Sequence, residues 1–222
     1  LKTLDRKEWR GEATAALLRI SGFDQPIEDP EEERPEQAWL EKQHPRHDTL
    51  LARLMERLLE WGEFATLATL VPAARWAKSN SVAGPLATLC ASPDDVLRNA
   101  AVEAVGWRLR KRDGSPDPLV KALEHAHPDT RFLAAEQLAR AGRNEGLSTL
   151  LSAIELVDDV ELRQRAVEAL GILGDARALD VLLRLAGEDA HALQEAAAEA
   201  IGHLGKSEKA DQIFALLERF AK

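Results

Sequence analysis

The sequence predicts an all-α protein in which short helical hairpins stack side by side into an α-α superhelix. Two observations lead to this fold class. The chain of 222 residues has no Tyr and only 5 Phe and 5 Trp, whereas Leu, Ala, Glu and Arg, which favour helices, dominate it. One sequence frame also recurs four times, at spacings of 33, 32 and 31 residues. A period of this length is typical of stacked helical repeats.

Residues 1–83 do not keep this frame and are expected to form an irregular helical cap. Apolar residues at helical spacing predict one helix over residues 5–20 and another over residues 49–61. Between them, residues 24–36 (DQPIEDPEEERPE) are dense in acid and proline and cannot bury enough apolar surface to fold by themselves. We therefore expect this segment to be a loop.

Residues 84–222 are expected to hold about four repeats, each made of two antiparallel helices. The second helix of each repeat carries the recurring frame, as in LRQRAVEALGILG from Leu162, whose apolar residues lie on one side of a helix. Aspartates that can cap free amide groups stand just before these helices: Asp94, Asp129, Asp159 and Asp189. Glycines close three of the segments, as expected after a helix C-terminus: Gly142, Gly174 and Gly205.

A further amphipathic run lies in each repeat outside this frame. These runs predict helices that begin near Pro116, Glu145, Ala176 and Lys209. A hairpin of this size cannot bury its apolar side alone, so successive hairpins must stack on one another.

The repeat has a recognisable relative. The segment LRQRAVEALGILGDARALDVLLRLAGED, residues 162–189, resembles the short HEAT-like repeats that also occur in phycobilisome lyase subunits. The resemblance covers about residues 84–222 and implies a HEAT-like, armadillo-type solenoid. It does not specify a function, because this repeat serves scaffolds, adaptors, lyases and other enzymes.

Composition narrows the possible partners and compartments. The net charge of -9 weakens the case for a broad nucleic-acid surface, which needs a dense field of Lys and Arg. The single cysteine, Cys90, excludes an intramolecular disulfide, and no stretch approaches the roughly 18 apolar residues of a membrane span. There is no basic and apolar leader, so we expect a cytoplasmic protein without membrane contact.

No pattern in the chain predicts catalysis. Phosphate loops, nucleophile elbows, HExxH and paired CxxC motifs do not occur. Two groups resemble metal ligands, namely His44, His47 and Asp48, and His125, His127 and Asp129; both are interpreted as loop and capping residues. Cys90 lies in an apolar run and is interpreted as a buried small hydrophobe. We therefore predict no catalytic residue, no enzymatic activity, no metal and no cofactor.

The resemblance implies that the second helix of each repeat lines the concave surface of the stack. The aligned acids on this side are Glu103, Glu136, Glu168 and Glu199. One turn further along lie Trp107, Arg140, Ile172 and His203. We expect these two rows to bind another protein, with the acids steering a basic segment and Trp107 acting as an apolar anchor. The glutamates are alternatively structural, paired with the recurring Arg98, Arg131 and Arg163 of neighbouring repeats.

Two other functions remain open. The one dense basic run, WRLRKR, could contact nucleic acid through Arg108, Arg110, Lys111 and Arg112, or could simply complement the dipole at a helix end. The resemblance also allows a phycobilin-lyase-like enzyme or chaperone, although no local motif marks a bilin pocket.

Overall fold

The computed structural model describes residues 45–77, 79–187 and 191–204, and all the regular structure in these ranges is helical. The chain divides into two compact units, residues 1–108 and 109–222, each considered by itself below. The expected boundary between a cap and the repeats, at residues 83 and 84, stays a prediction. Within the described ranges, no helix combines the length and apolar character that crossing a membrane requires.

The first unit is built from short helices around α3. It contains α3 (Pro45–Trp61), α4 (Phe64–Leu70), the 3-10 helices η3 (Val71–Trp76) and η4 (Asn80–Val82), α5 (Ala83–Leu89) and most of α6 (Asp95–Arg110). α3 confirms the helix predicted over residues 49–61. Its buried residues recur every three or four positions, which packs one side of α3 against α4 and η4: Leu51, Leu54, Met55 and Leu58. The predicted helix over residues 5–20 and loop over residues 24–36 lie outside the described residues.

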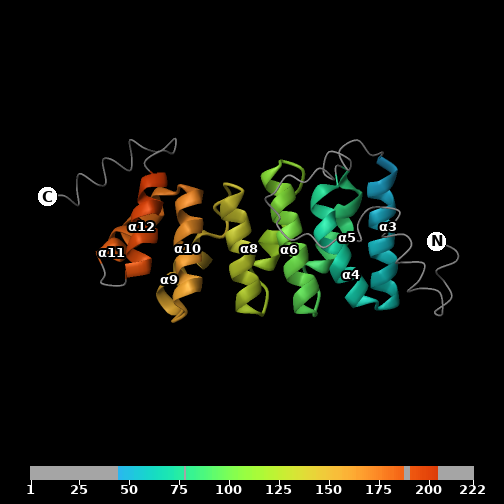
Figure 1. The fold of residues 1–222 in the computed structure, drawn as a ribbon, viewed down its shortest axis with the longest axis horizontal. Coiled ribbons are helices and arrows are strands. Elements are labelled where there is room, and N and C mark those ends of the chain that lie inside the picture. Colours follow the sequence, from blue (N-terminus) through green and yellow to red (C-terminus); the bar gives the residue numbers. More distant parts are fainter. Residues whose placement is uncertain (1–44, 78, 188–190, 205–222) are drawn as a thin grey trace. The chain divides into compact units, whose positions relative to one another are not determined.

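The described part of the second unit forms three hairpins (Figure 1). The pairs are α7 (Asp117–Ala122) with α8 (Pro128–Arg140), α9 (Leu147–Leu156) with α10 (Val160–Leu173), and α11 (Leu179–Ala186) with α12 (His191–Leu204). The 3-10 helix η5 (Ala176–Ala178) leads into α11. The second helices also pack on one another, α8 on α10 and α10 on α12. These hairpins confirm the predicted fold class of stacked helical repeats. The count of about four repeats over residues 84–222 stays a prediction, and the helix expected near Lys209 lies outside the described residues.

Buried aliphatic side chains join the hairpins of the second unit into one core. Leu150 of α9, Leu170 of α10 and Leu182 of α11 have no solvent exposure, and Ala166 and Ala197 let the helices come close. Burial of these side chains, at about 25 cal/mol for each Å² of apolar surface, is the main force that holds the stack together.

Helix ends follow the predicted signals at several positions. Asp159 caps α10 by accepting hydrogen bonds from the backbone N–H of Glu161 at 2.9 Å and of Leu162 at 3.3 Å. Asp94 accepts one from the N–H of Leu97 at 2.9 Å. Gly174 ends α10 with φ at 67°, in the left-handed region where a side chain is disfavoured.

Asp129 is not a cap, contrary to the prediction. α8 begins at Pro128, so Asp129 lies inside the first turn, and the residue before the helix is His127, which makes no side-chain capping bond. Proline is well suited to the first turn of a helix because its missing N–H is not needed there. The predicted signals at Asp189 and Gly205 lie outside the described residues.

α10 and α12 approach each other closely at Gly171. A Cβ atom added to Gly171 would lie 2.8 Å from both Cα and Cβ of Ala200. Such distances are below van der Waals contact, so this crossing needs glycine on one helix and a small residue on the other.

Candidate protein-interaction face

α10 and α12 present charged and apolar side chains on the side that the core does not use. On α10, Glu168 and Ile172 are exposed, whereas Val167, Ala169 and Leu170 point into the core. On α12, the side chain of Glu199 is 72% exposed, with the Nε2 atom of His203 3.8 Å from its carboxylate. We define the second-helix face as the set Arg140, Glu168, Ile172, Glu199 and His203. Four of its five members are exposed, and Arg140 is partly so.

Glu136 was expected on this face, but its side chain is only 4% exposed. Arg165 of α10 donates from Nη2 to its Oε2 at 2.6 Å and from Nε to its Oε1 at 3.5 Å. Arg140 donates from Nη2 to Oε1 at 3.3 Å. The carboxylate therefore joins α8 to the next repeat, and a partner could not reach it directly.

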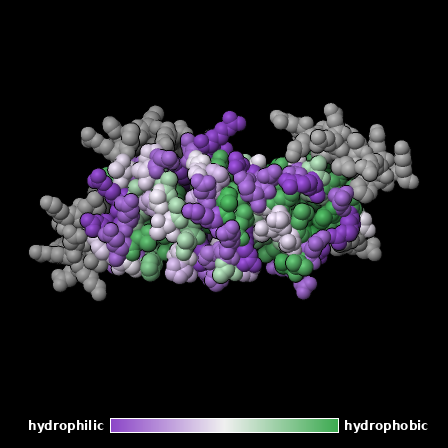
Figure 2. All heavy atoms as spheres, turned by 180° about the vertical axis from the view of Figure 1, so that it is seen from behind, coloured by the Kyte–Doolittle hydropathy of each residue, from purple (hydrophilic) through white to green (hydrophobic). Residues whose placement is uncertain are grey.

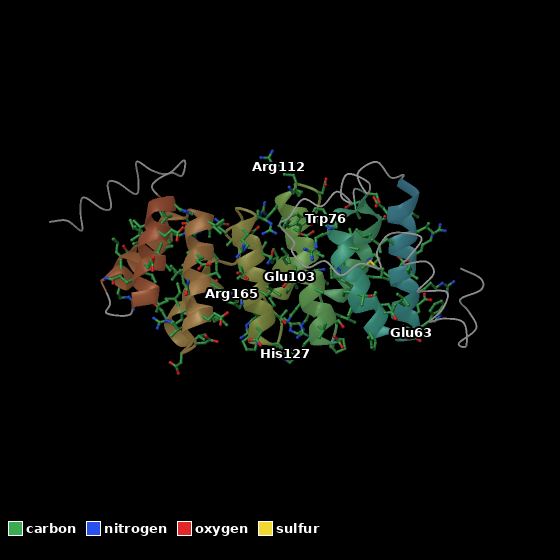
Figure 3. The ribbon with its side chains drawn as sticks, viewed as in Figure 1. Glu63, Trp76, Glu103, Arg112, His127 and Arg165 are labelled. Atoms are coloured by element: carbon green, nitrogen blue, oxygen red, sulfur yellow. The ribbon has the colours of Figure 1, made fainter. Side chains whose placement is uncertain are left out.

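Arg165 did not emerge from the sequence analysis, although the repeat frame contains a signal for it. At the equivalent position the other repeats have Ala100, Leu133 and Ala196. Arg165 extends from α10 on the side of α8 (Figure 3), and its guanidinium carbon lies 5.1 Å from the centre of the Phe132 ring. A charged residue at a position that is otherwise apolar marks this contact between repeats.

Two of the arginines that recur at the start of the frame, Arg98 and Arg131, bind backbone carbonyls and were predicted as possible partners of the aligned glutamates. Arg98 donates from Nη1 to the carbonyl of Ser92 at 2.8 Å, and Arg131 donates to those of His125 and Ala126 at 2.8 and 2.9 Å. These bonds tie the loop before each helix to its first turn. The aligned glutamate Glu136 is bound by two arginines, Arg165 of α10 and Arg140 of its own helix.

In the first unit, Glu103 and Trp107 lie one turn apart on α6. Glu103 is exposed and Trp107 is half-buried. The Trp107 ring meets that of Trp76 in a T-shaped contact, with centroids 5.0 Å apart and planes at 69°. Trp76, which the sequence analysis did not single out, thus supports the predicted anchor.

The basic run at the end of α6 contains both buried and exposed side chains. Arg108 is 4% exposed, and its guanidinium donates to the carbonyls of Ala77 and Ser79, the latter at 3.1 Å. It therefore holds the segment between η3 and η4 and is not presented to nucleic acid. Arg110 is half-buried, whereas Lys111 and Arg112 are exposed.

Three comparisons place this geometry among known proteins. The family model for HEAT repeats matches residues 116–202. The fold is also similar to a solved structure, the complex of CpcE and CpcF of phycocyanin lyase from Nostoc sp. PCC7120, with a TM-score of 0.51. That match has 19% sequence identity and covers 82% of this chain and 71% of the other. The chain therefore contains HEAT-like repeats. No curated protein matches its sequence.

This comparison contradicts the expectation that the chain is not an enzyme. The matched structure belongs to a lyase, so the helical repeats of this HEAT-like protein do not argue against catalysis. The prediction had rested on missing sequence motifs, and a site assembled from separate repeats leaves no short motif.

Of the two groups of possible metal ligands, the structure describes the one that contains His125 and His127. The imidazoles of His125 and His127 stack with centroids 5.3 Å apart, and Nδ1 of His125 accepts a hydrogen bond from the backbone N–H of His127 at 3.2 Å. Across the described ranges, no three His, Cys, Asp or Glu side chains form a group that could hold a metal. The side chains of His44 and His47 lie outside the described residues.

The second unit of this HEAT-like protein also has an open hollow of about 480 Å³ between α9, α10 and α11. Ile154 and Val181 supply apolar surface, and Glu155 and Arg184 approach to 3.4 Å at its side. Arg163 and Asp180 complete the lining. Figure 2, the view from behind Figure 1, shows apolar patches among hydrophilic side chains on the face that it draws.

Proposed function

We propose that this HEAT-like repeat protein binds another protein through the second-helix face. One observation carries the proposal: Glu168 and Glu199 occupy equivalent positions on adjacent helices and are exposed, while the core beneath them is complete without them. Ile172, at 46% exposure, adds an apolar contact one turn from Glu168. Acids around an apolar side chain suit a partner segment that carries basic residues and an apolar anchor.

In the first unit, considered by itself, Glu103 and Trp107 form a second surface that we propose binds protein. A half-buried tryptophan held against Trp76 offers a large, rigid surface that loses little side-chain entropy on binding. Glu136 contributes indirectly, because its buried carboxylate positions Arg140 of the second-helix face.

The test is a pull-down from lysate of the source organism, with and without nuclease. The wild-type chain is compared with the variant Glu168→Lys, Glu199→Lys and with a charge-matched control, Glu124→Lys, Asp180→Lys, whose sites are exposed outside the second-helix face. We expect some proteins to be retained by the wild type and the control, lost by the variant and indifferent to nuclease. Equal retention of all proteins by the variant would contradict the proposal.

The same experiment tests the nucleic-acid alternative. If Lys111 and Arg112, with Arg110, contacted nucleic acid, the retained material would be lost on nuclease treatment. It would also be lost in the variant Lys111→Glu, Arg112→Glu and kept in Glu168→Lys, Glu199→Lys.

A second candidate function is the handling of a bilin, favoured by the similarity to a phycocyanin lyase complex. Its test is the absorbance spectrum of a free bilin mixed with the protein. A saturable spectral change at a one-to-one ratio would support this candidate. An unchanged spectrum would leave protein binding as the better account.

A further inference from the structure

Two arginines from neighbouring repeats share one buried carboxylate at the edge of the second-helix face. Arg140 and Arg165 both donate to Glu136, at distances between 2.6 and 3.5 Å. Their side chains are 32% and 41% exposed, compared with 4% for Glu136. A molecule that approaches this point therefore meets the two guanidinium groups and not the carboxylate.

Taken by themselves, Arg140, Arg165 and Glu136 carry more positive than negative charge. Two guanidinium groups around one carboxylate give the three side chains a net charge of +1, within a chain whose net charge is -9. Arginine remains protonated at all physiological pH values. The group thus adds a positive point to a face whose other charged members are mainly acids.

The surrounding contacts hold the guanidinium group of Arg165 in place. Glu136 binds Arg165 through two donors, and the Phe132 ring lies beneath the same guanidinium at 5.1 Å. A guanidinium that is already fixed loses less side-chain entropy when it binds an anion. Planar N–H donors match the geometry of carboxylate and phosphate oxygens.

We propose that Arg140 and Arg165 form a binding site for a carboxylate, supplied by an Asp or Glu side chain of the partner protein. The neighbouring Glu168, one turn along α10, disfavours a doubly charged phosphate more than a singly charged carboxylate. The partner segment then carries an acid for this pair of arginines and basic residues for Glu168 and Glu199. The source of the carboxylate rests on the proposed function, whereas the site itself does not.

The test uses the full chain and the NMR signals of arginine Nε–Hε groups. The probes are N-acetylglutamate α-amide, which has one carboxylate, and inorganic phosphate. Signals are assigned by their loss in Arg140→Lys and Arg165→Lys. Arg143 and Arg177, each paired with one nearby acid, Glu145 and Asp175, are internal controls for nonspecific ion effects.

We expect the carboxylate probe to shift the Arg140 and Arg165 signals saturably, and to shift both control signals less. In Arg165→Gln the remaining Arg140 signal should respond with affinity weakened roughly tenfold, the loss of one charged hydrogen-bond donor. Shifts no larger than those of the controls would overturn the site. A response to phosphate alone would overturn the choice of a carboxylate. Either result would leave the proposed protein-binding function untouched, because the pull-down tests that function through substitutions of Glu168 and Glu199.

Discussion

Glu136 and Glu168 occupy the same position of successive repeats in different environments. Glu136 is buried between two arginines, whereas Glu168 is exposed and accepts a hydrogen bond from Gln164 at 3.1 Å. Glu136→Gln should lower the free energy of unfolding by about 1–3 kcal/mol, because it leaves two arginines without their counter-charge; their partial exposure reduces the loss. Urea unfolding measures it. The matched control, Glu168→Gln, should change stability by no more than about 0.5 kcal/mol. Equal effects would refute the contrast.

Cys90 is buried at 4% exposure, and burial raises the pKa of its thiol from 9.0 to about 12. The thiolate is the reactive species, so the native protein should react with a disulfide reagent far more slowly than the unfolded chain. Thiol labelling with and without denaturant measures this difference. Rapid labelling of the native protein would show that the thiol is accessible.

The same shift predicts how stability depends on pH. The folded pKa lies above the unfolded one, so between pH 9.0 and about 12 the unfolded chain has lost a proton that the folded chain retains. The contribution of the buried thiol is complete below pH 9 and declines as the pH rises through this window. The stability difference between wild type and Cys90→Ala should therefore shift against the wild type between pH 8 and 10.5. A constant difference would contradict the raised pKa.

At the scale of elements, the crossing of α10 and α12 depends on Gly171. Gly171→Ala places a methyl group 2.8 Å from Ala200 and forces the two helices apart. This substitution should lower the free energy of unfolding by about 1–3 kcal/mol, because the loss of packing exceeds the stabilisation from the higher helix propensity of alanine. The matched control is Gly202→Ala, at the same frame position of α12, where an added Cβ meets no atom of the described residues within 4 Å. This control should gain up to about 1 kcal/mol in thermal or urea unfolding. The same sign for both substitutions would argue against a tight crossing.

For the whole molecule, the division into residues 1–108 and 109–222 predicts local responses to substitution. Stability in repeat stacks is approximately a sum over repeats and their nearest neighbours. Gly171→Ala should therefore speed amide hydrogen exchange in α10 and α12 much more than in α3 and α5 of the first unit. Exchange followed by mass spectrometry measures it. Equal acceleration in both units would mean that the chain unfolds as one cooperative block.

The sequence by itself determined the repeated helices of this protein. Helix-forming composition, apolar residues at helical spacing and the frame of 33, 32 and 31 residues are local properties, and each is visible along the chain. Asp159 and Gly174 were predictable for the same reason, because capping depends on bonds within a few residues. Asp129 was not a cap, because the adjacent Pro128 starts the helix earlier.

Only the tertiary structure decided which members of each repeating set are buried. Glu136 and Glu168 are both glutamates at the same position of the repeat frame. Their exposure differs because Arg165, 29 residues away from Glu136 in the chain, packs on Glu136. The basic run predicted Arg108 as a possible surface contact, yet its guanidinium donates to the carbonyls of Ala77 and Ser79. Burial and pairing depend on neighbours brought together by stacking, and periodicity places a residue on a side of a helix without naming what covers it.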